Sequence, residues 1–133
     1  MTNAVIDASV LVRATIDQDA AAQRWVRAAD AGEVTGFAPD LIWAEYGNAL
    51  LGYIRRDVIE ARIARRVLEQ ALKLRVTIWS GLDLAVAALV VSTNRGVSVY
   101  DAHYVALAEA HDAVLVTADR RLAGAYERAE LLQ

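Results

Sequence analysis

Short apolar runs that predict β-strands alternate with longer segments that predict helices along most of this chain. Strands are expected at residues 3–7, 34–38, 76–79 and 113–117, with an edge strand at 129–132. Helices are expected from Ser9, over 19–31, from Pro39 through Tyr53, over 58–73, 82–93 and 99–111, and briefly after Asp119. Alternation of this kind favours a parallel sheet with helices on both faces. We therefore expect an α/β fold, a three-layer α/β/α sandwich around a central parallel sheet, in one domain over residues 1–133.

Four acidic residues stand where predicted strands end or predicted helices begin: Asp7, Glu45, Asp101 and Asp119. Asp7 closes one strand and Asp119 follows another, so their carboxylates converge if the two strands are neighbours. Ligands of open α/β sheets bind at this carboxyl edge. Carboxylates brought together without a cation repel one another, and hard oxygen ligands suit Mg²⁺ or Mn²⁺. The pattern predicts a divalent-metal site.

Several other kinds of site are excluded by the sequence. It contains neither the G-x-x-x-x-G-K-[ST] phosphate loop nor the G-x-G-x-x-G dinucleotide turn. Without cysteine, the chain has no disulfide, thiolate metal site or cysteine nucleophile. A phosphoreceiver or an Asp-x-Asp phosphatase would need a second early acid or a lysine after a strand, but Ser9 occupies the acid position and the single lysine, Lys73, lies at a helix end.

Four motifs in order resemble those of a known family. They are Val5-Ile6-Asp7-Ala8-Ser9, the stretch from Pro39 to Glu45-x-x-Asn48-Ala49-Leu50, the stretch Tyr100-Asp101-Ala102-x-Tyr104-x-Ala106-Leu107-Ala108, and Leu115-Val116-Thr117-Ala118-Asp119. Together they resemble the PIN-domain ribonucleases, in particular the VapC-type toxins of bacterial toxin–antitoxin pairs. The resemblance implies a parallel sheet between helices, an acidic quartet that binds Mg²⁺ or Mn²⁺, and endonucleolytic cleavage of RNA. Some relatives carry another acid where this chain has Arg121, which leaves the number of metals open.

Each candidate residue has an expected role in such a nuclease. Asp7, Asp101 and Asp119 are the expected metal ligands, and Glu45 completes the site or positions water. Attack by that water would leave a 5′-phosphate and a 3′-hydroxyl. The supporting residues are expected to orient these carboxylates, and they are Ser9, Asn48 and Thr117.

Structural readings of the same residues stay open at this point. Asp7 or Ser9 could cap the helix after the first strand, and Asp119 could cap the short helix that follows it. Asp101 could join a capping arrangement with Ser98, three residues earlier. Glu45 could be a solvent-facing helical acid. Two histidines and three tryptophans are expected to have structural or surface roles, with the tryptophans in the core or an interface: His103, His111, Trp25, Trp43 and Trp79.

The charge pattern contains one basic cluster in a chain of net charge −3. Five arginines fall between positions 55 and 66: Arg55, Arg56, Arg62, Arg65 and Arg66. They are either a solvated helix face or a surface that guides RNA or an acidic partner.

The apolar fraction of 56% exceeds the usual share of about 45–50%. This excess favours a homodimer, and the resemblance implies a VapB-like antitoxin as a second partner. The start of the chain has no basic leader, and the longest apolar run, Leu84 to Val91, is too short to span a bilayer. A cytoplasmic protein without membrane contact is therefore expected.

Two rival functions remain on the sequence alone. The chain could be a non-catalytic RNA- or protein-binding module of the same fold. It could also be a metal-dependent phosphatase acting on small phosphate esters, because an acidic site by itself does not define the substrate.

Overall fold

The computed structural model describes residues 1–133, which form five parallel strands and seven helices. The strands are β1 (Asn3–Ile6), β2 (Thr35–Pro39), β3 (Val76–Trp79), β4 (Val114–Thr117) and β5 (Ala129–Leu131). The helices are α1 (Ala8–Thr15), α2 (Ala20–Asp30), α3 (Ile42–Arg55), α4 (Ala61–Ala71), α5 (Gly81–Arg95), α6 (Val99–Ala110) and α7 (Arg120–Ala123). The α/β class and the central parallel sheet expected from the sequence are confirmed.

The strands lie in the order β3-β2-β1-β4-β5. From β1 the chain builds outward through β2 to β3, and it then returns to place β4 on the other side of β1. The strand order therefore reverses between β1 and β4, the position at which open α/β sheets form a ligand crevice. Ile6 pairs with Val116 in this register, so the residues after both strands leave the sheet together.

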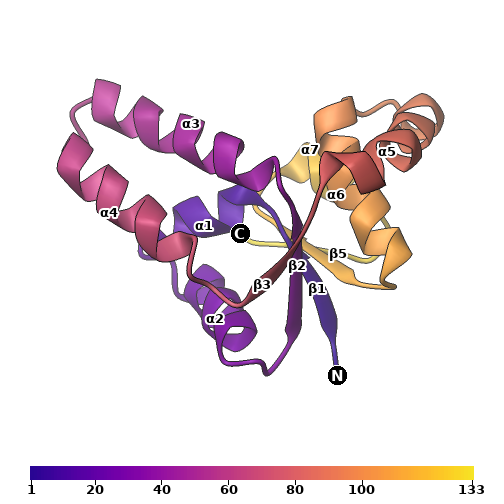
Figure 1. Ribbon diagram of the computed structural model, residues 1–133, viewed down its shortest axis with the longest axis horizontal. Coiled ribbons are helices and arrows are strands. Elements are labelled where there is room, and N and C mark those ends of the chain that lie inside the picture. The colour runs from indigo at the N-terminus through magenta and orange to yellow at the C-terminus, as the bar shows by residue number, and fades with distance from the viewer.

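Alternate residues of the central strands face opposite layers of helices. Ala4 and Ile6 of β1 pack with α1 and α2 on one face. Val5, between them, packs on the other face with Leu107 of α6 and Leu122 of α7. Figure 1 shows α1 and α2 on one side of the strands and α5, α6 and α7 on the other. The sheet is thus the middle layer of three.

A hairpin of α3 and α4 extends sideways from this sandwich (Figure 1). It has its own apolar cluster, in which Tyr46 and Leu50 of α3 pack with Ala64 of α4 and with Leu11 of α1. The cluster fixes α3 against α1. The first turn of α3 thereby starts beside the sheet, while the rest of the helix leads away from it.

The expectation that Pro39 begins a helix is wrong. Pro39 is the last residue of β2, paired with Trp79 of β3, and Asp40 N still donates to Trp79 O (2.8 Å). The register with β1 ends earlier, at Phe37. The proline therefore interrupts no hydrogen-bond ladder on that side, and α3 begins only at Ile42.

None of the helices has by itself the length and apolar composition of a membrane span. Helices α5 and α6 have this length and composition only when they are taken together, and a bend of 107° separates them.

Candidate active site

Asp7 follows β1 directly and is the N-cap residue of α1. It is 5% exposed, and its carboxylate accepts hydrogen bonds from Ser9 Oγ (2.5 Å), Val10 N (3.3 Å) and Thr117 Oγ1 (2.6 Å). Burial raises the pKa of Asp7, and the hydrogen bonds from Ser9 and Thr117 offset only part of that increase. The predicted capping role is confirmed, and the same contacts hold a buried carboxylate in one orientation.

Ser9 and Thr117 join Asp7 to the segment that carries Asp119. Ser9 Oγ accepts from Ala118 N (2.9 Å), and Thr117 Oγ1 accepts from Asp119 N (2.9 Å). Each hydroxyl thus donates to Asp7 and accepts from the backbone after β4. These are the contacts that an orienting role requires, although the role itself stays a prediction.

Glu45 reaches the same edge of the sheet from the first turn of α3 and is half-buried. Its Oε1 accepts a hydrogen bond from the Tyr104 hydroxyl on α6 (2.5 Å). Burial raises the pKa of Glu45, and the nearby charges of Asp7 and Asp101 raise it further, while the Tyr104 hydrogen bond and His103 lower it. Glu45 is therefore not a solvated helical residue but lies among the other acids, and its role in a metal site stays a prediction.

Sequence reasoning gave Tyr104 no role, yet this side chain supports Glu45. Burial first, and then the charge of Glu45, raise the pKa of Tyr104 well above its usual value, so the phenol remains protonated and donates. Its spacing from Asp101 in the sequence could have indicated this role. Tyr104 follows Asp101 by three residues, which places the two on one face of α6.

Asp101 and Asp119 both take part in helix capping. Asp101 N donates to Ser98 Oγ (3.1 Å), and Asp119 Oδ1 accepts from the backbone N atoms of Arg121 (2.9 Å) and Leu122 (3.4 Å). Burial raises the pKa of Asp101, and the charge of Asp119 raises it further, while Arg121 lowers it. Both predicted capping arrangements are confirmed, and the two acids also interact with each other.

The four acids come from four separate segments of the chain, and each one interacts with the next through its charge. Asp7 interacts with Glu45, Glu45 with Asp101, and Asp101 with Asp119. As the side chains stand, no three acids or histidines of this chain lie close enough to hold one ion. The donor set nevertheless fits a hard divalent cation, because it offers carboxylate oxygens alone and because a cation offsets the cost of burying these charges, which is the main cause of their raised pKa values.

Comparison with known proteins identifies the family. The PIN domain model matches residues 4–128. This chain belongs to the PIN-domain family. It is 36% identical over 118 residues to ribonuclease VapC9 of Mycobacterium tuberculosis, an alignment that covers 89% of this chain and 87% of VapC9. The family resemblance expected from the four motifs is therefore confirmed.

Two solved structures share the fold of this PIN domain. PAE2754 from Pyrobaculum aerophilum superposes with a TM-score of 0.73 at 28% identity, covering 96% of this chain and 82% of PAE2754. A chain in a toxin–antitoxin complex from Klebsiella pneumoniae superposes with a TM-score of 0.61 at 18% identity, covering 91% of each chain.

The histidines of this PIN domain differ in their distance from the acids. His111 stacks on Phe37, with ring centroids 4.0 Å apart, and meets the edge of Trp79 at 4.8 Å, so its structural role is confirmed. His103 contacts Val99 O through Nδ1 (2.6 Å) and is close enough to Glu45 to affect the pKa of that carboxyl. The tryptophans pack against the three apolar clusters, as expected for core residues: Trp25, Trp43 and Trp79.

Asn48 is exposed on α3, one turn after Glu45, and makes no side-chain hydrogen bond to it. Its side chain instead lines a groove between α1 and α3. No hydrogen bond in this structure therefore supports the expectation that Asn48 orients Glu45.

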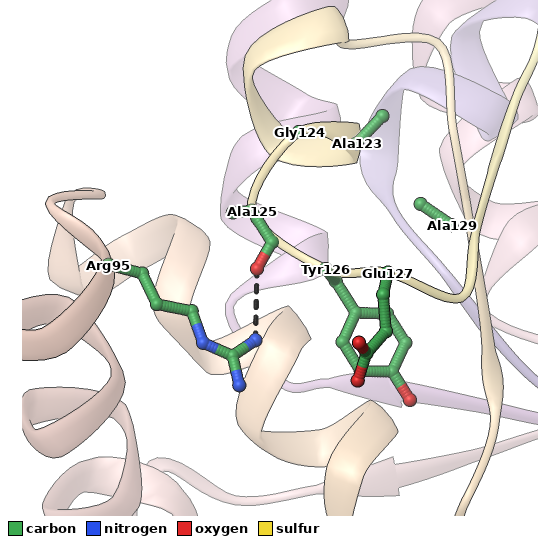
Figure 2. Close-up of a pocket in the computed structure, with 7 residues that line it drawn as sticks. All are labelled: Arg95, Ala123, Gly124, Ala125, Tyr126, Glu127 and Ala129. Atoms are coloured by element: carbon green, nitrogen blue, oxygen red, sulfur yellow. Dashed lines mark hydrogen bonds between the residues drawn. The ribbon is translucent and has the colours of Figure 1, made fainter.

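A second hollow of about 610 Å³ lies at the end of α7, and none of the four acids lines it. Figure 2 shows Arg95 reaching toward the loop that carries Tyr126 and Glu127. Arg95 donates to Ala125 O (2.9 Å) and pairs with Glu109 (2.5 Å). Because its one cation is already paired, this hollow is a poor site for an anionic substrate.

Proposed function

We propose that this PIN domain is a Mg²⁺- or Mn²⁺-dependent endoribonuclease and the toxin of a VapBC-type toxin–antitoxin pair. The observation that carries the proposal is the meeting of four interacting carboxylates at the edge of the sheet where the strand order reverses between β1 and β4. Similarity to ribonuclease VapC9 supports RNA as the substrate.

The four acids have different roles in the proposed site. Asp7, Asp101 and Asp119 hold the cation, and Glu45 completes the site or positions the attacking water. When bound, the cation supplies Lewis acidity, which polarises the phosphodiester and makes water more acidic. In-line attack by water leaves a 5′-phosphate and a 3′-hydroxyl, so no side chain serves as the nucleophile.

The neutral residues around the acids preserve this arrangement. Ser9 and Thr117 hold the Asp7 carboxylate from two sides, and Tyr104 holds Glu45 through its hydroxyl. Hydrogen bonds to charged groups are the stronger kind in proteins, about 1.5–3 kcal/mol each. The carboxylates of Asp7 and Glu45 are thereby oriented before substrate arrives.

Activity against two substrates separates this proposal from its rivals. Purified protein is incubated with RNA and, separately, with 4-nitrophenyl phosphate, each with Mg²⁺, with Mn²⁺ and with a chelator. The proposal expects RNA cleavage that needs metal, and products with 5′-phosphates. Hydrolysis of the ester without RNA cleavage would indicate the phosphatase, and RNA binding without cleavage would indicate the non-catalytic module.

The proposed antitoxin is a small VapB-like protein. The Klebsiella chain of the same fold occurs in a toxin–antitoxin complex, and a partner of this kind would inhibit by placing a basic side chain against the acidic site. Expression of this chain alone should then arrest growth, and coexpression with the neighbouring reading frame should restore growth and yield a copurifying complex. Harmless expression of an enzyme shown to be active in vitro would contradict the toxin role.

A homodimer is the proposed assembly. Four apolar side chains of α5 recur at helical spacing and are exposed, with Leu82 at 93% and Val86 at 80%, joined by Leu89 and Val90. Such a stripe is unusual on a monomer surface. Since RNA is the proposed substrate, the cytoplasm is the proposed location.

A further inference from the structure

A groove of about 550 Å³ runs between α1 and α3, and its lining includes Ser9, the neighbour of Asp7, but none of the four acids. Ser9 and Asn48 line its near end. Ser9 donates to Asp7 at 2.5 Å, and Asn48 follows Glu45 by one helical turn. An occupant of the groove therefore contacts Ser9, which in turn holds the Asp7 carboxylate of the proposed nuclease.

The far end of the groove carries a cation stacked on an aromatic ring. The Arg56 guanidinium lies 4.9 Å from the centroid of the Tyr53 ring, and both residues line the groove. Arg13 also lines the groove, but its positive charge is balanced by Asp17, whose carboxylate lies 4.0 Å away. None of the ion pairs in the chain includes Arg56. The lining has two cations and one carboxylate, so its surplus charge is positive.

The groove stays open because a helix residue facing it lacks a side chain. Gly52 lies within α3, where glycine costs about 0.5–1 kcal/mol relative to alanine. An added Cβ there would meet only Arg56 Nη1, at an ordinary 3.5 Å. Folding therefore does not require glycine at this position, whereas a long side chain there would enter the groove that Gly52 lines.

We propose that this groove holds the RNA nucleotide adjacent to the cleaved phosphodiester. The assignment rests on the proposed ribonuclease function and adds a binding subsite to it. Arg56 contacts the phosphate of that nucleotide, and the stacked Arg56–Tyr53 pair extends the stack of its base, as guanidinium planes and aromatic rings do in single-stranded RNA recognition. The volume fits a nucleotide-sized ligand. The surplus positive charge favours an anion over a basic antitoxin segment.

Kinetics on an oligoribonucleotide that the wild type cleaves test this subsite. Gly52→Met fills the groove, and Gly47→Met is the matched control, because Gly47 lies about 140° around the same helix at 3.6 residues per turn and its added Cβ would meet nothing within 4 Å. Arg56→Gln removes the unpaired cation from an exposed position. The expected result is a KM about tenfold higher for Gly52→Met and Arg56→Gln with kcat within about twofold, and unchanged constants for Gly47→Met. Arg56→Gln should also lower the salt slope of RNA binding by about 0.7, the value for one single-strand phosphate contact.

The outcomes distinguish the subsite from the function on which it rests. Wild-type cleavage with an unchanged KM in both Gly52→Met and Arg56→Gln, each shown to be folded by thermal melting, would overturn the subsite alone. Loss of antitoxin copurification with an unchanged KM would reassign the groove to the antitoxin. A wild-type protein that cleaves no RNA with either metal would overturn the function and the subsite together.

Discussion

Thr117 Oγ1 donates to Asp7 Oδ2 at 2.6 Å, although 110 residues separate the two along the chain. The bond crosses from the end of β4 to the end of β1, where the strand order reverses. Because the same hydroxyl accepts from Asp119 N, one side chain sets the positions of two acids. The sheet itself thus determines the spacing of the proposed metal ligands.

Asp7→Asn should abolish RNA cleavage while leaving the fold intact. The amide keeps a capping oxygen for α1 but removes the charge that the cation needs. Changes to residues that only orient metal ligands cost about 10–100-fold, so loss of a ligand should exceed that range. Cleavage assays, Mn²⁺ titration calorimetry and thermal melting provide the three measurements. Retained activity would refute the assignment, and a large drop in melting temperature would indicate that capping is the main role of Asp7.

The metal-free protein should lose stability as pH rises above the ordinary carboxyl range of about 4. Burial raises the folded-state pKa values of Asp7, Glu45 and Asp101 above their unfolded values. The folded state therefore binds more protons than the unfolded state between those values, and stability falls as pH rises through that window. In chelator, the melting temperature of Asp7→Asn relative to wild type should increase from pH 4 to pH 7.5, and Mg²⁺ should reduce the difference. A constant difference across this range would contradict the assigned pKa shift of Asp7.

Tyr104→Phe should reduce cleavage by about 10–100-fold, because the hydroxyl that orients Glu45 is lost. Tyr46→Phe is the matched control. Tyr46 is equally buried and bonds Thr15 at 2.8 Å, away from the acids. Tyr104→Phe should lose about 1.5–3 kcal/mol of stability and Tyr46→Phe about 1 kcal/mol, and only Tyr104→Phe should lose kcat. Equal activity of the two variants would show that Tyr104 is merely structural.

Neutralising the basic cluster should weaken RNA binding and flatten its salt dependence, since phosphate contacts release counterions. The residues to be changed together are Arg55, Arg56, Arg62, Arg65 and Arg66. Arg62 pairs with Glu60 and Arg65 with Glu69, both in solvent, so these two should contribute least. Removal of Arg24 and Arg27, exposed on α2, is the control for loss of positive charge elsewhere, and the change in salt slope is compared per arginine removed. A change per arginine equal to that of the control would indicate that the whole cluster is solvated surface.

Val86→Glu on α5 should convert the proposed dimer to a monomer. The side chain is 80% exposed, so the fold tolerates the charge, whereas an apolar interface would not. Light scattering of wild type and variant measures the mass of each. The same substitution at Val58, exposed between α3 and α4, is the control. A monomeric wild type would contradict the dimer directly.

The strand ends could be read from the sequence because their apolar runs are short and unambiguous. Asp7 and Asp119 were therefore correctly expected at the ends of two strands, whereas the pairing of β1 with β4 became known only from the structure. Pro39 was misassigned because a proline suits both the first turn of a helix and the end of a strand, and only the pairing with Trp79 decides between them. The contact between Tyr104 and Glu45 depends on how α3 and α6 approach each other, which no local pattern encodes.

The central position of β1 has a consequence for the timing of synthesis. Asp7 and Glu45 are synthesised before Asp101 and Asp119, and β1 gains its neighbour β4 only when residues 114–117 follow. Until then Asp7 has no Thr117 beside it, and neither Asp101 nor Asp119 is in place. A nascent chain without β4 therefore has no complete site, so the proposed nuclease gains its activity only after residues 114–119 have been synthesised.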